Sequence, residues 1–137
     1  MAWTHKRILY HKPNSNVFLL HYGGQADGSD LTDYVRFDIC ADAPGMAKTQ
    51  IDWLRINAGG VYAFLEWDAT TDDFICAAVD GGGPTEFPPP FDAADLIAGN
   101  MRVDPASSGT TGDIVLTTLG GAAGDGVVID AIIRVLP

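Results

Sequence analysis

The chain has 137 residues, 47% of them hydrophobic and 19% charged, and its 8 basic and 18 acidic residues give a net charge of −10. This length suits a single domain over residues 1–137, which can bury a core without a disulfide or a metal. The excess of carboxylates argues against nucleic acid and anionic membranes as partners, because both attract clustered Lys and Arg. We see no signal-like segment and no apolar run long enough to span a membrane, and expect a soluble protein made in a cytoplasm.

The first 15 residues are locally basic within this acidic chain and contain a weak strand pattern, KRILYH. They predict either an N-terminal arm that docks on an acidic neighbour or a charged edge strand, in which Lys and Arg discourage wrong pairing. A second weak strand pattern follows in NVFLLHY. Histidines lie at positions 5, 11 and 21, and these spacings match no familiar zinc site, so we expect no metal centre there.

Alternation of apolar and polar residues predicts strands through the middle of the chain. In DYVRFDICAD, the alternation places one set of side chains on one face: Val35, Phe37 and Ile39. The other set faces the opposite way: Tyr34, Arg36 and Asp38. In TQIDWLRIN, Leu54 and Ile56 are expected opposite Ile51 and Trp53.

The stretch FLEWDATTDDFICAAVD, residues 64–80, contains four carboxylates close together: Glu66, Asp68, Asp72 and Asp73. An EF-hand loop would need a central Gly and a distal Glu, which this stretch lacks. A catalytic acid pair would need a cleft and one raised pKa. Asp and Thr side chains that bond to turn amides explain the stretch more simply, as a hairpin tip. Whether the loop Asp68–Asp73 binds a cation stays open.

The strand preceding this tip, VYAFLEWD, predicts four inward-facing side chains: Val61, Ala63, Leu65 and Trp67. Further strands are predicted in DFICAAVD, GDIVLTTLG and GVVIDAIIRVL. The best helix candidate is FDAADLIAG, and the run Pro88–Pro90, flanked by Phe87 and Phe91, predicts a stiff extended loop. About eight short strands with Gly-rich turns predict an all-β, single-domain antiparallel β-sandwich, jelly-roll-like.

The two cysteines, Cys40 and Cys76, stand in apolar surroundings, and we expect both to be buried small hydrophobes. A disulfide between them is not implied. No Gly-x-Ser-x-Gly elbow and no Gly-rich phosphate loop occurs in the sequence. We therefore expect neither an enzyme nor a cofactor.

Several phrases resemble small virion proteins of tailed bacteriophages: VRFDIC, IDWLRI, YAFLEWDATTDD and GTTGDIVLTTLGGAAGDGVVIDAIIRV. The resemblance covers residues 16–135, and it is greatest to capsid decoration (cement) proteins. It implies a β-sandwich that binds the outer capsid surface as a homotrimer and stabilises the shell, with the major capsid protein as partner. The segment GGGPTEFPPPFD and the end RVLP depart from the pattern.

We expect the docking surface in two stretches of the chain. The candidate interface residues are Trp3, His5, Lys6, Arg7, Phe87, Pro88, Pro89, Pro90 and Phe91. The alternative is a tail or fibre module that binds a receptor or glycan through exposed aromatic side chains, with Trp53, Trp67 and Tyr62 as candidates, or another structural protein of the virion.

Overall fold

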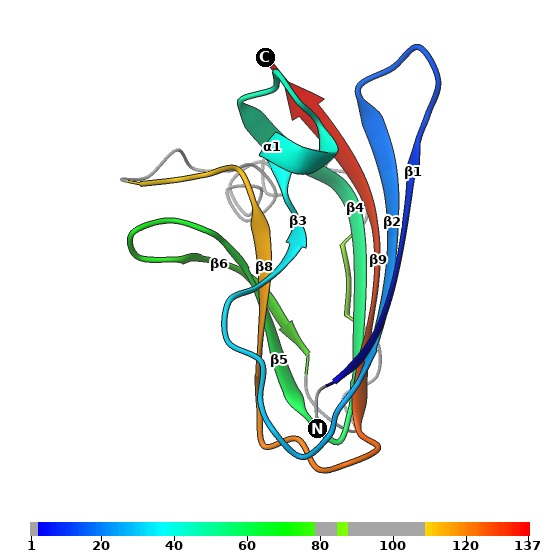
Figure 1. The fold of residues 1–137 in the computed structure, drawn as a ribbon, viewed down its shortest axis with the longest axis vertical. Helices are drawn as coiled ribbons and strands as arrows, with labels where there is room; N and C mark the ends of the chain where they lie inside the picture. The colour runs from blue at the N-terminus through cyan, green and yellow to red at the C-terminus, as the bar shows by residue number, and fades with distance from the viewer. Residues whose placement is uncertain (1–2, 79–84, 88–108) are drawn as a thin grey trace.

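A computed structural model describes residues 3–78, 85–87 and 109–137. These residues form two antiparallel β-sheets that pack face to face, with one short helix at one end (Figure 1). The predicted all-β sandwich is confirmed. We expected about eight strands, and the described part of the chain has nine, because the three-residue β7 is an additional edge strand.

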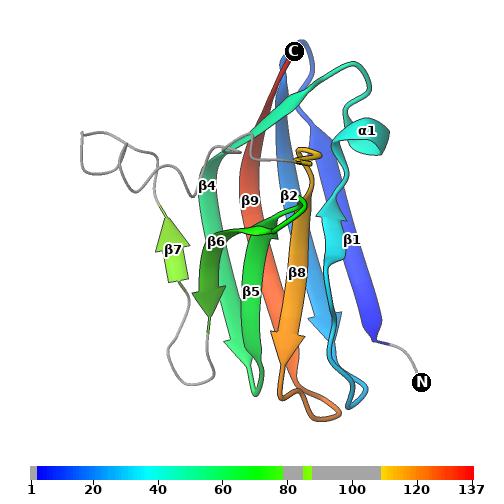
Figure 2. The ribbon, with the colours of Figure 1, turned by 90° about the vertical axis from the view of Figure 1, so that its left-hand side faces the viewer.

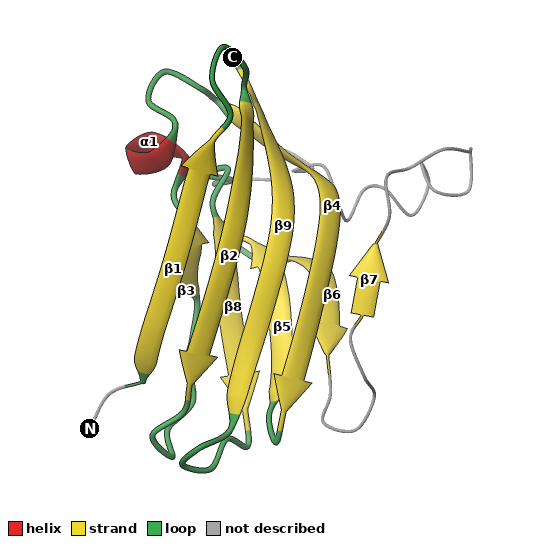
Figure 3. Ribbon diagram, turned by 90° about the vertical axis from the view of Figure 1, so that its right-hand side faces the viewer, coloured by secondary structure: helices red, strands yellow, loops and turns green. Residues whose placement is uncertain are grey.

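Sheet A has the strand order β1-β2-β9-β4-β7. Its strands are β1 (Thr4–His11), β2 (Val17–Gln25), β9 (Gly126–Leu136), β4 (Lys48–Gly59) and β7 (Thr85–Phe87). Sheet B has the order β3-β8-β5-β6. Its strands are β3 (Tyr34–Phe37), β8 (Ile114–Leu119), β5 (Tyr62–Trp67) and β6 (Asp73–Ala78). Figure 2 looks onto sheet B and Figure 3 onto sheet A.

The core lies between the sheets and takes every second residue from the long strands, as a pleated strand requires. On β9 the buried residues are Val127, Ile129, Ala131, Ile133 and Val135. On β5 and just before it they are Val61, Ala63, Leu65 and Trp67, each no more than 2% exposed. The inward face predicted for VYAFLEWD is therefore confirmed, and Trp67 is a core residue.

On β4 the predicted alternation is wrong at one position. The pairing of β4 with β9 shifts register between Ile51 and Trp53, so that Asp52 is an extra residue. Such a β-bulge changes the phase of the alternation. As a result Ile51 and Leu54 are both 1% exposed in the core, whereas Trp53 lies on the outer face. Two hydrogen bonds hold the Asp52 carboxylate, from Gln50 Nε2 at 2.8 Å and Arg134 Nε at 3.0 Å.

A second register shift corrects the prediction for DYVRFDICAD. β3 shifts against β8 between Val35 and Phe37, which turns Val35 outward and buries both Arg36 and Phe37. The strand then ends, because the Asp38 carboxylate accepts hydrogen bonds from the backbone N–H groups of Cys40 and Ala41. This N-cap begins the one-turn helix α1 (Ile39–Asp42).

The structure also corrects one of the two cysteine predictions. Cys40 lies on α1 and is exposed as a free thiol, instead of being buried. It belongs to a helical turn rather than to the continued strand, which explains the error. The helix expected in FDAADLIAG lies outside the described residues.

The bulge on β4 predicts a contrast between two aliphatic side chains of sheet A. Ile51→Ala should lower the free energy of unfolding by about 2–5 kcal/mol, because it leaves a cavity in the core. Leu19→Ala should cost less than about 1 kcal/mol, because Leu19 is 45% exposed on the outer face. Urea unfolding measures both. Equal small losses would place Ile51 on the outer face, as simple alternation does.

Candidate docking surface

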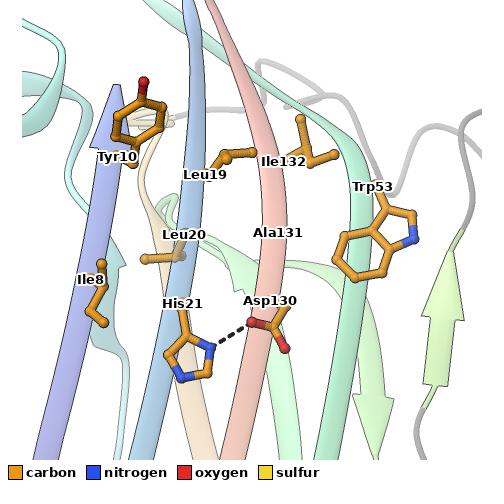
Figure 4. Close-up of a pocket in the computed structure, with 9 residues that line it drawn as sticks. All are labelled: Ile8, Tyr10, Leu19, Leu20, His21, Trp53, Asp130, Ala131 and Ile132. Carbon is orange, nitrogen blue, oxygen red and sulfur yellow. Dashed lines mark hydrogen bonds and ion pairs between the residues drawn. The ribbon is translucent and has the colours of Figure 1, made fainter. Parts of the chain in front are cut away.

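The outer face of sheet A carries a group of apolar side chains that the core does not cover. Ile8 and Tyr10 on β1 and Leu19 on β2 are 51%, 53% and 45% exposed. Ile132 on β9 and Trp53 on β4 continue the group across the sheet (Figure 4). We call these five residues the apolar face. Exposed apolar groups of this kind often mark interaction surfaces.

A shallow depression of about 450 Å³ lies in the apolar face, and one polar pair borders it. His21 Nδ1 lies 2.6 Å from Asp130 Oδ1, across the pairing of β2 with β9. Both side chains are partly open to solvent. The depression is open to solvent rather than enclosed, and the polar pair gives it hydrogen-bonding capacity at its margin (Figure 4).

Of the predicted N-terminal interface residues, Trp3 is buried and His5 is partly buried, whereas Lys6 and Arg7 are exposed. Odd-numbered side chains of β1 face sheet B, whereas even-numbered ones face solvent. Trp3 precedes the strand and is 6% exposed, with its Nε1 donating to the carbonyl of Ser29 at 2.8 Å. Arg7 pairs with Asp42 on α1 at 2.5 Å. Among the four predicted residues, Lys6 alone has an even number and lies on the same face as Ile8.

His5 belongs to an aromatic group that closes the space between β1, β2 and β3. Its ring stacks on Tyr34, with centroids 4.4 Å apart, and its Nδ1 lies 2.7 Å from the Tyr22 hydroxyl. The guanidinium of Arg36 lies over both tyrosine rings, 3.4 Å from the Tyr34 centroid and 4.4 Å from that of Tyr22. Stacking and cation–π contacts thus hold this end of the sandwich closed.

Burial in this group shifts the ionisation of its members. Burial and, secondarily, the Arg36 charge lower the pKa of His5 and so favour its neutral form. Burial raises the pKa of Tyr22 to about 12. Burial also lowers the pKa of Arg36, whose Nε has no hydrogen-bond partner among the described residues. The group is structural: it stabilises the attachment of β1 and β2 to β3.

The second predicted stretch is not adjacent to the first. Phe87 ends β7, and β7 and β1 are the two opposite edges of sheet A (Figure 3). Pro88, Pro89, Pro90 and Phe91 lie outside the described residues. The described structure therefore does not bring the two predicted stretches together.

The acidic loop between β5 and β6 is the tip of a hairpin, as the sequence predicts. Trp67 and Asp73 pair across it. The Asp72 carboxylate accepts from the N–H of Ala69 at 3.0 Å, and the Asp68 carboxylate accepts from the Thr111 hydroxyl at 2.9 Å. These bonds fix the turn and tie it to the segment before β8.

The sequence analysis did not predict one cluster of carboxylates in this region. Asp33, from the loop before β3, lies beside Glu66 and Asp72, and carboxylate oxygens of the three lie within 4.8 Å of one another. The distances would suit a shared cation, although exposed acidic groups often cluster without one. Burial, followed by the charges of Asp72 and Asp33, raises the pKa of Glu66.

Sequence reasoning missed the apolar face because it assigned the function of the N-terminal stretch by charge and aromatic content. The available signal was alternation: in HKRILYHK, Ile8 and Tyr10 share one face with Lys6. Pairing of β1 with β2 then sets Tyr10 beside Leu19 and Ile8 beside His21.

No family model matches the chain, and no curated protein is significantly similar to it. Among the described residues, no helix has the length and apolar character needed to cross a membrane. The site is therefore interpreted from its own geometry.

Glu66→Gln should stabilise the protein at neutral pH. Because the folded state raises the pKa of Glu66 above its ordinary 4.5, the folded protein binds this proton more tightly than the unfolded chain does. The stability gained from protonating Glu66 is complete below pH 4.5, and it is lost as the pH rises through the pKa of Glu66 in the folded state. Removing the charge should raise the free energy of unfolding at pH 7 by roughly 0.5 kcal/mol, and change it little at pH 4.

The matched control is Asp27→Asn, where hydrogen bonds from Ser29 lower the carboxyl pKa. The sign is opposite, so this variant should lose stability at pH 7. Thermal unfolding at both pH values measures the two effects. A Glu66→Gln variant that loses stability at pH 7 would contradict a raised pKa of Glu66 in the folded protein.

Proposed function

We propose that the protein is a capsid decoration (cement) protein of a tailed bacteriophage, which binds the major capsid protein on the outer surface of the shell. The resemblance of the sequence phrases motivates this proposal, and the exposed apolar face is the observation that carries it. A protein that stabilises a shell needs a surface that excludes water on contact, with polar groups at its margin. The apolar face, with the His21–Asp130 pair beside it, meets that requirement.

The strand order supports the same proposal. Without β1, the two sheets have four strands each, in the orders β2-β9-β4-β7 and β3-β8-β5-β6. The chain crosses to the opposite sheet at every step except between β5 and β6, which is the wrapping expected of a jelly roll built from two Greek keys. Viral capsid proteins and lectins both use this architecture. The fold therefore favours a binding role without selecting the partner.

The charge is compatible with an outward-facing position. A net charge of −10 favours solubility and repels polyanions. The contact itself would be made by the part of the surface that has few carboxylates: β1 and β2 contain none. We propose that this side of sheet A faces the capsid.

Two single substitutions test this docking surface, each replacing one leucine on the outer face of one sheet. Leu19→Glu should weaken attachment to capsids stripped of decoration by about tenfold or more, because it places a charge in the buried centre of the contact. Leu119→Glu is the matched control: Leu119 is 51% exposed, but on sheet B. It should attach with unchanged affinity.

Sedimentation of protein with capsids measures both affinities, and thermal unfolding checks that both variants are folded. Equal affinities for the two variants would contradict docking through sheet A. Truncation of residues 1–12 is a poorer test, because it removes β1 together with the buried Trp3.

The copy number of the chain in purified virions tests the class of function. Quantitative mass spectrometry should find hundreds of copies, near parity with the major capsid protein. A few to a few dozen copies would instead favour the tail or fibre. Absence from the particle would overturn both.

Glycan or receptor binding remains the second candidate. The structure removes Trp67 from it, because this side chain is 0% exposed. Trp53 and Tyr10 border the depression beside His21 and Asp130, and aromatic rings next to hydrogen-bonding groups are typical of sugar sites. Glycan-array binding that disappears in folded Trp53→Ala would support this candidate, and a flat array would count against it.

A further inference from the structure

The free edge of β1 has unused hydrogen-bonding groups. β1 is the outermost strand of sheet A and pairs only with β2. The N–H of Lys12 donates to the carbonyl of Val17 at 3.0 Å and so continues the β1–β2 ladder. Because backbone direction alternates in an antiparallel pair, even-numbered residues of β1 bond to β2, and odd-numbered ones point away from the sheet. The outward groups belong to His5, Arg7, Leu9 and His11.

Within the described ranges, no backbone hydrogen bond uses these outward groups. Natural edge strands avoid pairing with another chain by being short, bulged, interrupted by Pro or charged. β1 runs for eight residues, without Pro and without a register shift, and of its two charged side chains Arg7 is paired with Asp42. Lys6 is its only charged side chain on the outer face, where Ile8 and Tyr10 are exposed. The strand is therefore competent to accept another strand (Figure 3).

Charge indicates where two copies of this protein can approach each other. The chain carries a net charge of −10, so two copies repel in most orientations. The first 25 residues are the exception: they contain Lys6, Arg7 and Lys12 and no Asp or Glu. Arg7 is in turn neutralised by Asp42. Contact between two copies through β1 therefore brings no carboxylates of β1 or β2 face to face.

We propose that β1 pairs antiparallel with β1 of a second copy, about a two-fold axis at Ile8. Outward groups are on odd-numbered residues in both copies, so hydrogen-bonded pairs join odd to odd. With the axis at Ile8, Arg7 pairs with Leu9 of the second copy, and each such pair exchanges two hydrogen bonds. On the outer face Ile8 meets Ile8 of the second copy, and Lys6 lies beside the Tyr10 ring, a cation–π pair.

Neighbouring registers are less favourable. An axis at Arg7 would oppose the two Arg7 guanidinium groups directly. An axis at Leu9 would oppose Lys6 and Lys12. Like charges directly across a strand pair are destabilising. An axis midway between two residues would pair odd-numbered with even-numbered residues, and their backbone hydrogen-bonding groups would not face each other. The axis at Ile8 avoids both problems.

Pairing in this register makes one continuous sheet from two copies and joins their apolar faces. The inference does not rest on the proposed function, because it concerns the free protein in solution. The homotrimer implied by the sequence resemblance would use other surfaces, since a two-fold contact between identical strands cannot close a three-fold ring.

Disulfide trapping tests both the pairing and its register. In a Cys40→Ser background, which removes one exposed free thiol, Ile8→Cys should form a disulfide-linked dimer under mild oxidation. Residues opposed in a non-hydrogen-bonded pair have Cα atoms about 4.5 Å apart, within disulfide range. Tyr10→Cys is the matched control: it is equally exposed, but its two copies would lie about 13 Å apart along the strands. It should cross-link at least about tenfold more slowly.

A second measurement needs no cysteine. Arg7→Pro removes an outward N–H but no bond to β2, so it should weaken the dimer about tenfold or more while the protein stays folded. Arg7→Ala loses the same ion pair with Asp42 but keeps the N–H, and should dimerise like the wild type. Light scattering over a concentration series measures the masses. The Cys40→Ser protein without an added cysteine gives the background cross-linking.

Selective cross-linking of Ile8→Cys, together with a loss of dimer in Arg7→Pro alone, would support the proposal. Equal cross-linking of Ile8→Cys and Tyr10→Cys would overturn the register. Wild-type mass unaffected by Arg7→Pro, with no cross-linking of Ile8→Cys above background, would overturn the pairing. Capsid attachment plays no part in these readouts, so their failure is distinguishable from failure of the proposed function.

Discussion

Burial of every second residue between two sheets is the constraint on which the rest of this structure depends. β9 meets it without interruption over its whole length and forms the longest pairing, with β4 and β2 on either side. Two bulges change the phase of this alternation. The bulge at Asp52 places Ile51 and Leu54 together in the core, whereas the bulge at Arg36 turns Val35 outward and buries Arg36 beside Phe37.

The same constraint explains why β1 has two different faces. Its odd-numbered side chains contact other parts of the fold: His5 stacks on Tyr34, Leu9 packs against the core, and Arg7 pairs with Asp42 at the surface. Its even-numbered side chains have nothing to cover them, because no strand or helix of the described structure lies over the outer face of sheet A (Figure 3). A strand anchored on one face and open on the other, with a free backbone edge, is suited to contact with another protein.

Several of the acidic residues have structural roles. Asp38 caps α1, Asp52 holds the bulge on β4, and Asp68 ties the β5–β6 hairpin to the segment before β8. Each carboxylate accepts hydrogen bonds from backbone or side-chain donors and so fixes a local turn, bulge or cap. The remaining acidic charge keeps the surface soluble and leaves the β1–β2 hairpin as its basic exception.

The sequence by itself determined the fold class, every described strand except β7 and the inward face of VYAFLEWD, because period-two alternation and turn residues are local signals. It also determined the basic character of the N-terminal stretch. Only the tertiary structure decided that Ile51 is buried, that Trp3 and His5 face inward, and that Asp33 joins Glu66. Bulges depend on the partner strand, and exposure depends on which elements cover a face, so neither is encoded in the spacing of residues along one strand.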